Sequence, residues 1–307
     1  MNRARPSTRA LVAALVAALV LIAGIVVATT LSSSPEDDRG TTATPPSSAA
    51  PSSSAPSSAA PIDPYDPALA LTADPDRKRR AAQITSTFEN STLELQYDYA
   101  ENIGDGRGIT AGRAGFTSAT GDLLLLVRRY TELEPDNGLA RYLPALEAVN
   151  GTDSEAGLDG FEDAWAQAAQ DPAQRALQDA LVDRLYFTPA MRLATGTGIV
   201  TPLGQAILWD TMIQHGLGGD NGTQAMIAET EQRYGSVGAV ESEWLQHFLD
   251  VRLEYLYRAY EGTTDDADAA SESRIAALRS LLDDDELALE LPLTWDVYGS
   301  TYTLPAS

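Results

Sequence analysis

The sequence contains no cysteine and only two histidines, His215 and His247, among its 307 residues. The absence of cysteine excludes disulfides, thiolate nucleophiles and cysteine-ligated metal sites. Two widely separated histidines offer little to a catalytic metal, so we expect neither a metal nor another cofactor, and we expect His247 to be structural. Without cross-links, stability must come from a buried core, for which about 240 residues are sufficient.

Basic residues are also scarce, because 21 lysines and arginines stand against 44 acidic residues, which gives a net charge of −23. The arginines and acids before residue 66 cancel, so the net charge falls on residues 66–307. An acidic body repels nucleic acid and anionic lipid and attracts cationic polymers, so we expect no nucleic-acid partner. Acidity also favours solubility, so charge alone does not identify the partner.

Residues 1–30 are typical of an export signal, since three arginines precede an apolar run of 18 residues from Leu11 to Ala28. The run is also long enough to span a bilayer if it stays uncleaved. Either form predicts an extracellular protein, secreted or membrane-tethered. Residues 31–65 are rich in Ser, Thr, Pro and Ala and predict a disordered linker, which is either a tether or a leader removed with the signal. Residues 66–307 remain as one folded domain.

The apolar periodicity predicts a mostly helical domain with one small sheet and no internal repeat. Asp74 followed by Pro75 predicts a helix start, and the apolar stripe of this helix ends at Glu89. Thr120 is expected to cap a helix whose residues 123–127 form a hinge between lobes. Further helices are expected over residues 138–149, 160–187, 201–216, 223–234, 240–261 and 268–283, followed by an extended tail over 291–302.

Two charged residues interrupt apolar helical stripes. Asp210 lies in register with Leu203 and Ile207, and Arg252 lies in register with Leu249 and Leu256. A buried unpaired charge is costly, so we predict that the two helices meet and that Asp210 pairs with Arg252. The alternative is that either side chain extends to the surface, as arginines often do.

Two carboxylates, Glu89 and Asp105, flank one predicted turn. Alternation over residues 97–103 predicts a strand, and glycines around Asp105 and Arg107 allow a sharp turn that approaches a ligand closely. Glycosidic hydrolysis needs two such acids, one that donates a proton and one that activates water. A helix-terminal glutamate and an Asp-Gly-Arg-Gly turn are also ordinary structural features, so the pair alone does not decide the function.

Three segments resemble the signature of glycoside hydrolase family 46 chitosanases, and the resemblance extends from about residue 74 to the C-terminus. The segment between Glu89 and Tyr97 is shorter than in the family, which leaves some contacts at the edge of the cleft open. The signature segments are residues 88–91, 97–110 and 115–122, and looser matches follow in the same order at residues 130–135, 142–146, 210–216 and 248–252.

This resemblance implies an α+β, mostly helical, lysozyme-like two-lobed fold, with a small antiparallel sheet in the minor lobe and the substrate cleft between lobes. It implies that residues 66–307 form a catalytic domain, a monomer that cleaves β-1,4 bonds within chitosan, a cationic polysaccharide, by inverting acid–base hydrolysis. Two alternatives stay open. One is a lysozyme-like hydrolase of chitin or peptidoglycan, and the other is a tethered polysaccharide-binding protein without turnover.

The resemblance also implies catalytic roles. Glu89 matches the general acid, and its place at a helix end next to apolar Phe88 suits a carboxyl that stays protonated. Asp105 matches the general base, and Thr110 matches the residue whose hydroxyl holds the attacking water. Arg107 is expected to keep a nearby carboxylate ionised through a charge-assisted hydrogen bond. The family also places the pair of Asp210 and Arg252 behind the acid.

Substrate contacts are expected from four further residues. Asp122 matches a position that binds a sugar amine, although an aspartate in the first turn of a helix also serves as a cap. Tyr99 and Glu101 lie on the predicted strand, where they suit an aminosugar or simply pack. His215 precedes a Gly-rich loop that could move over the cleft.

Overall fold

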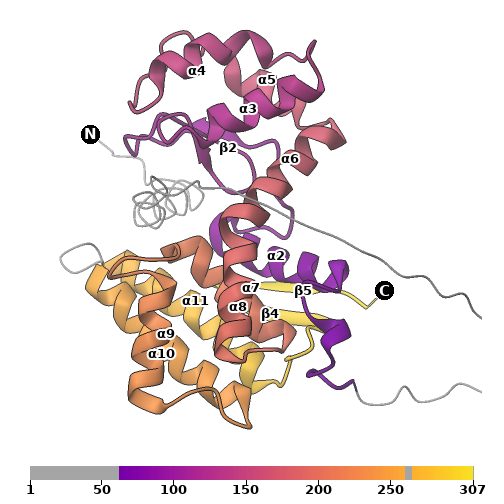
Figure 1. Cartoon of the computed structure of the whole chain (residues 1–307), viewed down its shortest axis with the longest axis vertical. Helices are drawn as coiled ribbons and strands as arrows, with labels where there is room; N and C mark the ends of the chain where they lie inside the picture. The colour runs from indigo at the N-terminus through magenta and orange to yellow at the C-terminus, as the bar shows by residue number, and fades with distance from the viewer. Residues whose placement is uncertain (1–61, 260–264, 307) are drawn as a thin grey trace, which may run out of the picture.

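The computed structural model describes residues 62–259 and 265–306, which form two lobes, one above the other in Figure 1. The architecture is mostly helical with a small antiparallel sheet in the upper lobe, as predicted. The predicted export signal over residues 1–30, and nearly all of the predicted linker over 31–65, lie outside the described residues. Within the described part of the chain, no helix is long and apolar enough to cross a bilayer.

The upper lobe holds a three-stranded sheet in the order β1-β2-β3, covered by helices (Figure 1). Its register places Thr110 opposite both Glu101 and Thr117 on the flanking strands. The sheet thereby brings two predicted site residues together. The elements of this lobe are β1 (Ala100–Asn102), β2 (Ile109–Ala111), β3 (Phe116–Thr117), α3 (Asp122–Leu133), η3 (Ala140–Tyr142), α4 (Leu143–Val149), α5 (Phe161–Ala168) and α6 (Pro172–Val182).

The lower lobe packs its helices around α8, a helix that is buried along almost its whole length. A two-stranded antiparallel sheet, β4-β5, closes this lobe beside α11 where only an extended tail was predicted. Its elements are η2 (Pro67–Leu69), α2 (Pro75–Asn90), α7 (Thr188–Thr197), α8 (Pro202–His215), α9 (Thr223–Tyr234), α10 (Glu241–Ala259), α11 (Asp265–Asp283), β4 (Leu293–Val297) and β5 (Ser300–Leu304).

The connection between the lobes differs from the prediction. The single helix expected over residues 160–187 is wrong, because α5 ends at Ala168 and Asp171 caps a new helix that begins with Pro172. This helix, α6, continues through a π-helical turn, η4 (Asp183–Phe187), into α7 and so joins the two lobes (Figure 1). The predicted hinge at residues 123–127 is also wrong, since α3 packs on α4 and α6 inside the upper lobe.

Helix α2 begins as predicted. The carboxylate of Asp74 accepts hydrogen bonds from the backbone of Asp76 and Arg77, and Pro75 occupies the first helical position. Thr120 does not cap α3 as expected, because the N-cap position before Asp122 is occupied by Gly121.

Candidate active site

Glu89 lies in the last turn of α2, as predicted, and its carboxylate pairs with a buried arginine. Its Oε1 lies 2.7 Å from Nη1 of Arg274 on α11, and 16% of the Glu89 side chain is exposed against 1% for Arg274. Phe88 is fully buried, and the guanidinium of Arg274 lies 5.1 Å from its ring centroid. The predicted proton donor therefore opens to solvent on one side and contacts a fixed cation on the other.

Asp210 is the hub of the charges behind Glu89. The predicted ion pair with Arg252 is confirmed, with Oδ2 of Asp210 2.8 Å from Nη2 of Arg252. Arg274 also donates to both carboxylate oxygens of Asp210, at 2.7 and 3.1 Å, and the Thr85 hydroxyl adds a bond of 3.1 Å. Glu89, Arg274, Asp210 and Arg252 thus form a chain of alternating charge.

Burial alone would raise the pKa of Asp210, but the positive charges of Arg274 and Arg252 more than offset it and lower the pKa to about 2. Asp210 is therefore ionised at neutral and mildly acidic pH, and it bonds to both guanidinium groups. Because Arg274 bonds to Asp210, Asp210 also holds the guanidinium group that Glu89 contacts.

Arg274 was missed by sequence analysis, although the sequence contained a signal for it. It lies three residues after Ser271, four before Leu278 and seven before Leu281, which are all buried on α11. The same test that identified Asp210 and Arg252, a charge in register with an apolar stripe, would have identified it.

Asp105 lies in the turn between β1 and β2, in the upper lobe. Three glycines, Gly104, Gly106 and Gly108, have φ values of 74°, 83° and 70°, which confirms the sharp turn expected there. The carboxylate of Asp105 accepts bonds from the backbone N–H of Arg107 at 3.0 Å and from its Nε at 2.8 Å, and it also pairs with Nη2. The carboxylate that Arg107 contacts through charge-assisted hydrogen bonds is therefore that of Asp105.

Thr110 lies on β2 beside this turn. Its hydroxyl is buried, and no described residue forms a hydrogen bond with it. A buried hydroxyl in a native protein normally has a partner, so this one is available to a water or a substrate group. The role of holding the attacking water stays a prediction for this hydroxyl.

Tyr99 and Glu101 lie close to the predicted base, on one side of the sheet. The Tyr99 hydroxyl donates to Oε2 of Glu101 at 3.4 Å. Burial raises the pKa of Tyr99 to about 12, and the negative charges of Glu101 and Asp105 act in the same direction. The structure thus brings these three residues together, and their contact with an aminosugar stays a prediction.

Asp122 is tied into its own turn. Its Oδ1 accepts hydrogen bonds from the backbone of Thr117 and Leu123, both at 2.8 Å, and from the Thr120 hydroxyl at 2.7 Å. Burial raises the pKa of Asp122, partly offset by these bonds. Oδ1 therefore bonds within the start of the helix, as the alternative role of a cap predicts. Only Oδ2 would be left to contact a sugar amine.

His215 is not where its predicted role requires it. The ring lies at the end of α8 and is only 3% exposed, so it does not face a substrate in this structure. Burial lowers the pKa of His215 well below its usual value, and the positive charges of Arg252 and Arg274 act in the same direction. The neutral, buried ring lies behind the charge network and is closed to a substrate in this arrangement, so the expected substrate contact is corrected accordingly.

Tyr186, which sequence analysis missed, marks the junction of the lobes. It belongs to η4, the turn that joins α6 to α7. Burial raises the pKa of Tyr186 to about 12, with the negative charges of Asp122 and Glu89 acting in the same direction and Arg107 opposing them. Charged groups of both lobes therefore act on this ring, Glu89 from the lower lobe and Asp122 and Arg107 from the upper lobe.

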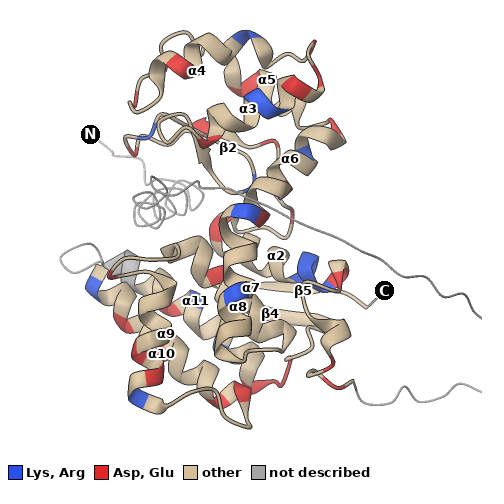
Figure 2. Ribbon diagram, viewed as in Figure 1, with Lys and Arg blue, Asp and Glu red and all other residues tan. Residues whose placement is uncertain are grey.

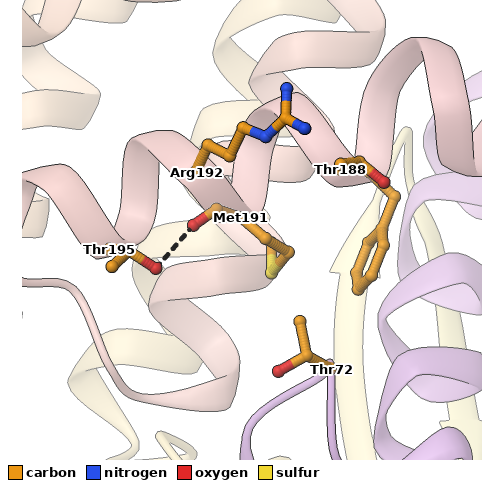
Figure 3. Close-up of a pocket in the computed structure, with 6 residues that line it drawn as sticks. Thr72, Thr188, Met191, Arg192 and Thr195 are labelled. Atoms are coloured by element: carbon orange, nitrogen blue, oxygen red, sulfur yellow. Dashed lines mark hydrogen bonds between the residues drawn. The ribbon is translucent and has the colours of Figure 1, made fainter. Parts of the chain in front are cut away.

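A separate cavity of about 340 Å³ lies on α7, and Figure 3 shows the residues that line it. None of the predicted site residues belongs to it. Within residues 62–259 and 265–306, no group of three or more His, Asp or Glu side chains is arranged to hold a metal ion.

The family model of glycosyl hydrolase family 46 matches residues 83–293. The chain is 43% identical over 224 residues to a chitosanase of Bacillus subtilis (strain 168). This alignment covers 71% of this chain and 81% of that protein. It is 40% identical over 237 residues to a chitosanase of Streptomyces sp. (strain N174), with coverage of 75% and 83%.

A solved structure gives the same result. The Gynuella sunshinyii chitosanase in complex with chitotetraose is 43% identical, with a TM-score of 0.66 and coverage of 75% of this chain and 98% of that one. This match confirms the predicted two-lobed, lysozyme-like α+β fold, and the relatives identify the protein as a glycoside hydrolase. The chain therefore belongs to glycosyl hydrolase family 46.

Proposed function

We propose that the protein cleaves β-1,4 bonds within chitosan by inverting acid–base hydrolysis. The observation that carries this proposal is the presentation of two differently bonded carboxylates by opposite lobes. Glu89 pairs with Arg274 below the junction, and Asp105 is held by Arg107 above it. An inverting enzyme needs such a pair, with room between the two groups for a water molecule.

In the first part of the reaction, Glu89 donates its proton to the glycosidic oxygen as the bond from C1 to this oxygen breaks. The sugar passes through an oxocarbenium-like state, and the aglycone leaves as an alcohol. Glu89 becomes a carboxylate at this moment, and the guanidinium of Arg274 stabilises the new negative charge. Because Arg274 also binds Asp210, its charge is shared and does not act on Glu89 alone.

In the second part, water attacks C1 from the opposite face. The Thr110 hydroxyl orients this water, and Asp105 accepts its proton, so a new C1–O bond forms with inverted configuration. Closure of the lobes around η4 would bring acid, water and base together. This closure is a prediction that follows from placing the two acids on different lobes.

Charge supports a polycationic substrate. The net charge is −23, and Asp and Glu residues occur on both lobes in Figure 2. Such a field raises the local concentration of a polymer of protonated amines. A chitosanase variant from Bacillus subtilis MY002, 38% identical to this chain, was solved in complex with six GlcN units, which are amino sugars.

The experiment that tests the substrate compares polymers. We expect release of reducing ends from fully deacetylated chitosan to exceed release from chitin or peptidoglycan by about 100-fold or more, because acidic subsites bind amines and not acetamides. Faster release from chitin or peptidoglycan would favour the lysozyme-like alternative. Binding to chitosan without release would favour the non-catalytic alternative.

Removing the Thr110 hydroxyl tests the water-holding role. We expect Thr110→Val, which preserves shape, to lower kcat on the order of 10–100-fold because the attacking water loses its orientation. Thr110→Ser restores the hydroxyl and serves as the control, with kcat near that of the wild type. Equal rates for the valine and serine variants would remove Thr110 from the mechanism.

Export is the setting in which this activity makes sense, since an extended polymer cannot be reached from inside a cell. The basic residues and apolar run of residues 1–30 support a secreted or membrane-tethered protein, and residues 31–65 would space the catalytic domain from the cell surface. Fractionation of cells expressing the full chain tests this. Activity confined to the cytoplasm would contradict it.

A further inference from the structure

The hairpin of β4 and β5 carries a bulky residue in an unfavourable conformation. Val297 pairs with Ser300, so only Tyr298 and Gly299 form the turn, with φ values of 53° and 75°. Both residues lie in the left-handed region, as in a type I′ turn, where Asn, Asp or Gly are preferred at the first position. A tyrosine there is strained and persists only if surrounding contacts fix it, and such outliers cluster at functional sites.

The contacts of Tyr298 lead to the proton donor from two directions. Its hydroxyl donates to the carbonyl oxygen of Phe88 at 3.2 Å, one residue before Glu89. Its backbone N–H donates to Oγ of Ser273 at 2.7 Å, one residue before Arg274. Tyr298 thus links the two backbone segments that carry the members of the Glu89–Arg274 ion pair.

The Phe88 carbonyl needs such a partner. Helix α2 ends at Asn90, so this carbonyl is among the last four of the helix. No backbone N–H within the helix donates to it. Thr87, the residue before Phe88, is also held by the β4–β5 hairpin, because Nε1 of Trp295 donates to the buried Thr87 hydroxyl at 3.0 Å. Two side chains of one hairpin therefore hold the final turn of α2.

We infer that Tyr298 is a positioning residue for the proton donor: by fixing the last turn of α2 against α11, it sets the orientation of Glu89 toward the cleft. This inference rests on the proposed role of Glu89 as the general acid. Burial raises the pKa of Tyr298 to about 12, with Arg274 and Glu89 acting in opposite directions, so the phenol remains a donor at neutral and acidic pH.

The test is Tyr298→Phe, which keeps the ring and removes the donor. We expect kcat on chitosan to fall about tenfold while KM stays within about twofold, because misorientation of the acid affects the chemical step and not binding. Tyr302→Phe is the matched control, since Tyr302 lies on β5 of the same hairpin, stacked on Trp295, and should retain wild-type kcat. Circular dichroism and thermal unfolding establish that both variants are folded at the assay temperature.

A double variant separates positioning from general stability. In a Glu89→Gln background, Tyr298→Phe should cause no further loss of turnover, because it acts only through Glu89. Wild-type kcat in Tyr298→Phe, an equal loss in Tyr302→Phe, or an additional tenfold loss in the double variant would each overturn the inference. If Glu89→Gln alone keeps wild-type turnover, the proposed function fails instead, and the two failures are distinguishable.

Discussion

Glu89→Gln is expected to lower the turnover of soluble chitosan by about 10²–10⁴-fold, which is the usual contribution of a general acid. Glutamine has nearly the same shape and can still bond to Arg274, but its amide cannot protonate the leaving oxygen. Binding should therefore stay near normal. Reducing-end release measures the turnover, and calorimetric titration with a glucosamine oligomer measures the affinity.

Two companion variants make this result specific. Asp105→Asn should cause a severe loss of turnover with near-normal binding as well, since an amide cannot accept the proton of the attacking water. Glu147→Gln is the control. It removes the same charge from α4 in the upper lobe, where Glu147 forms an exposed pair with Arg128 of α3. Wild-type turnover in either catalytic variant would reassign the roles.

Asp210→Asn is expected to destabilise the fold at pH 7 by about 3–5 kcal/mol, the usual cost of breaking a buried ion pair. The reason is that Arg252 and Arg274, whose side chains are 0% and 1% exposed, would lose the carboxylate that both of them share. Urea unfolding measures the free energy. Asp250→Asn, which removes an exposed partner of Arg279, should cost no more than about 1 kcal/mol.

The same variant has a defined pH dependence. The pKa of Asp210 is lowered from its ordinary value of 3.8 to about 2 in the folded protein, so its ionised form stabilises the fold fully above pH 3.8. This contribution is lost as the pH falls toward 2. The difference between wild type and Asp210→Asn should therefore shrink between pH 4 and pH 2, and a constant difference across that window would contradict the assignment.

Local signals made part of the structure predictable. Asp74 and Pro75 predicted the start of α2, and Glu89 lies at the end of the apolar stripe of this helix. The charges of Asp210 and Arg252 within apolar stripes predicted their pairing, because desolvation leaves few alternatives. Each of these predictions needed only the pattern within individual helices and the general cost of burying a charge.

The remainder depends on contacts between distant segments. Arg274 lies 185 residues from Glu89 in sequence, and the hydroxyl of Tyr298 lies 210 residues from the carbonyl that it contacts. Periodicity does not reveal which helices meet. The apolar pattern across residues 160–187 also concealed the break before Pro172 and the continuation through η4, so the hinge was placed in the wrong helix.

His215 shows the limit of reading loops from sequence. The glycines after it suggested a mobile segment over the cleft. His215 itself is the last residue of α8, a helix that is buried along almost its whole length. Its side chain is oriented by the surrounding helices, which no local pattern specifies. The roles expected for Glu89 and Asp105 from the family resemblance stay predictions, which the variants described above test.

The anomeric form of the first product tests the central claim most directly. Proton NMR during the initial turnovers of a chitosan oligomer, before mutarotation, distinguishes the α and β anomers at the new reducing end. An acid and a base acting on one water between opposite lobes predict the α anomer from a β-linked substrate. Accumulation of the β anomer would mean a covalent intermediate and would contradict the assignment of Glu89 and Asp105 as an inverting pair.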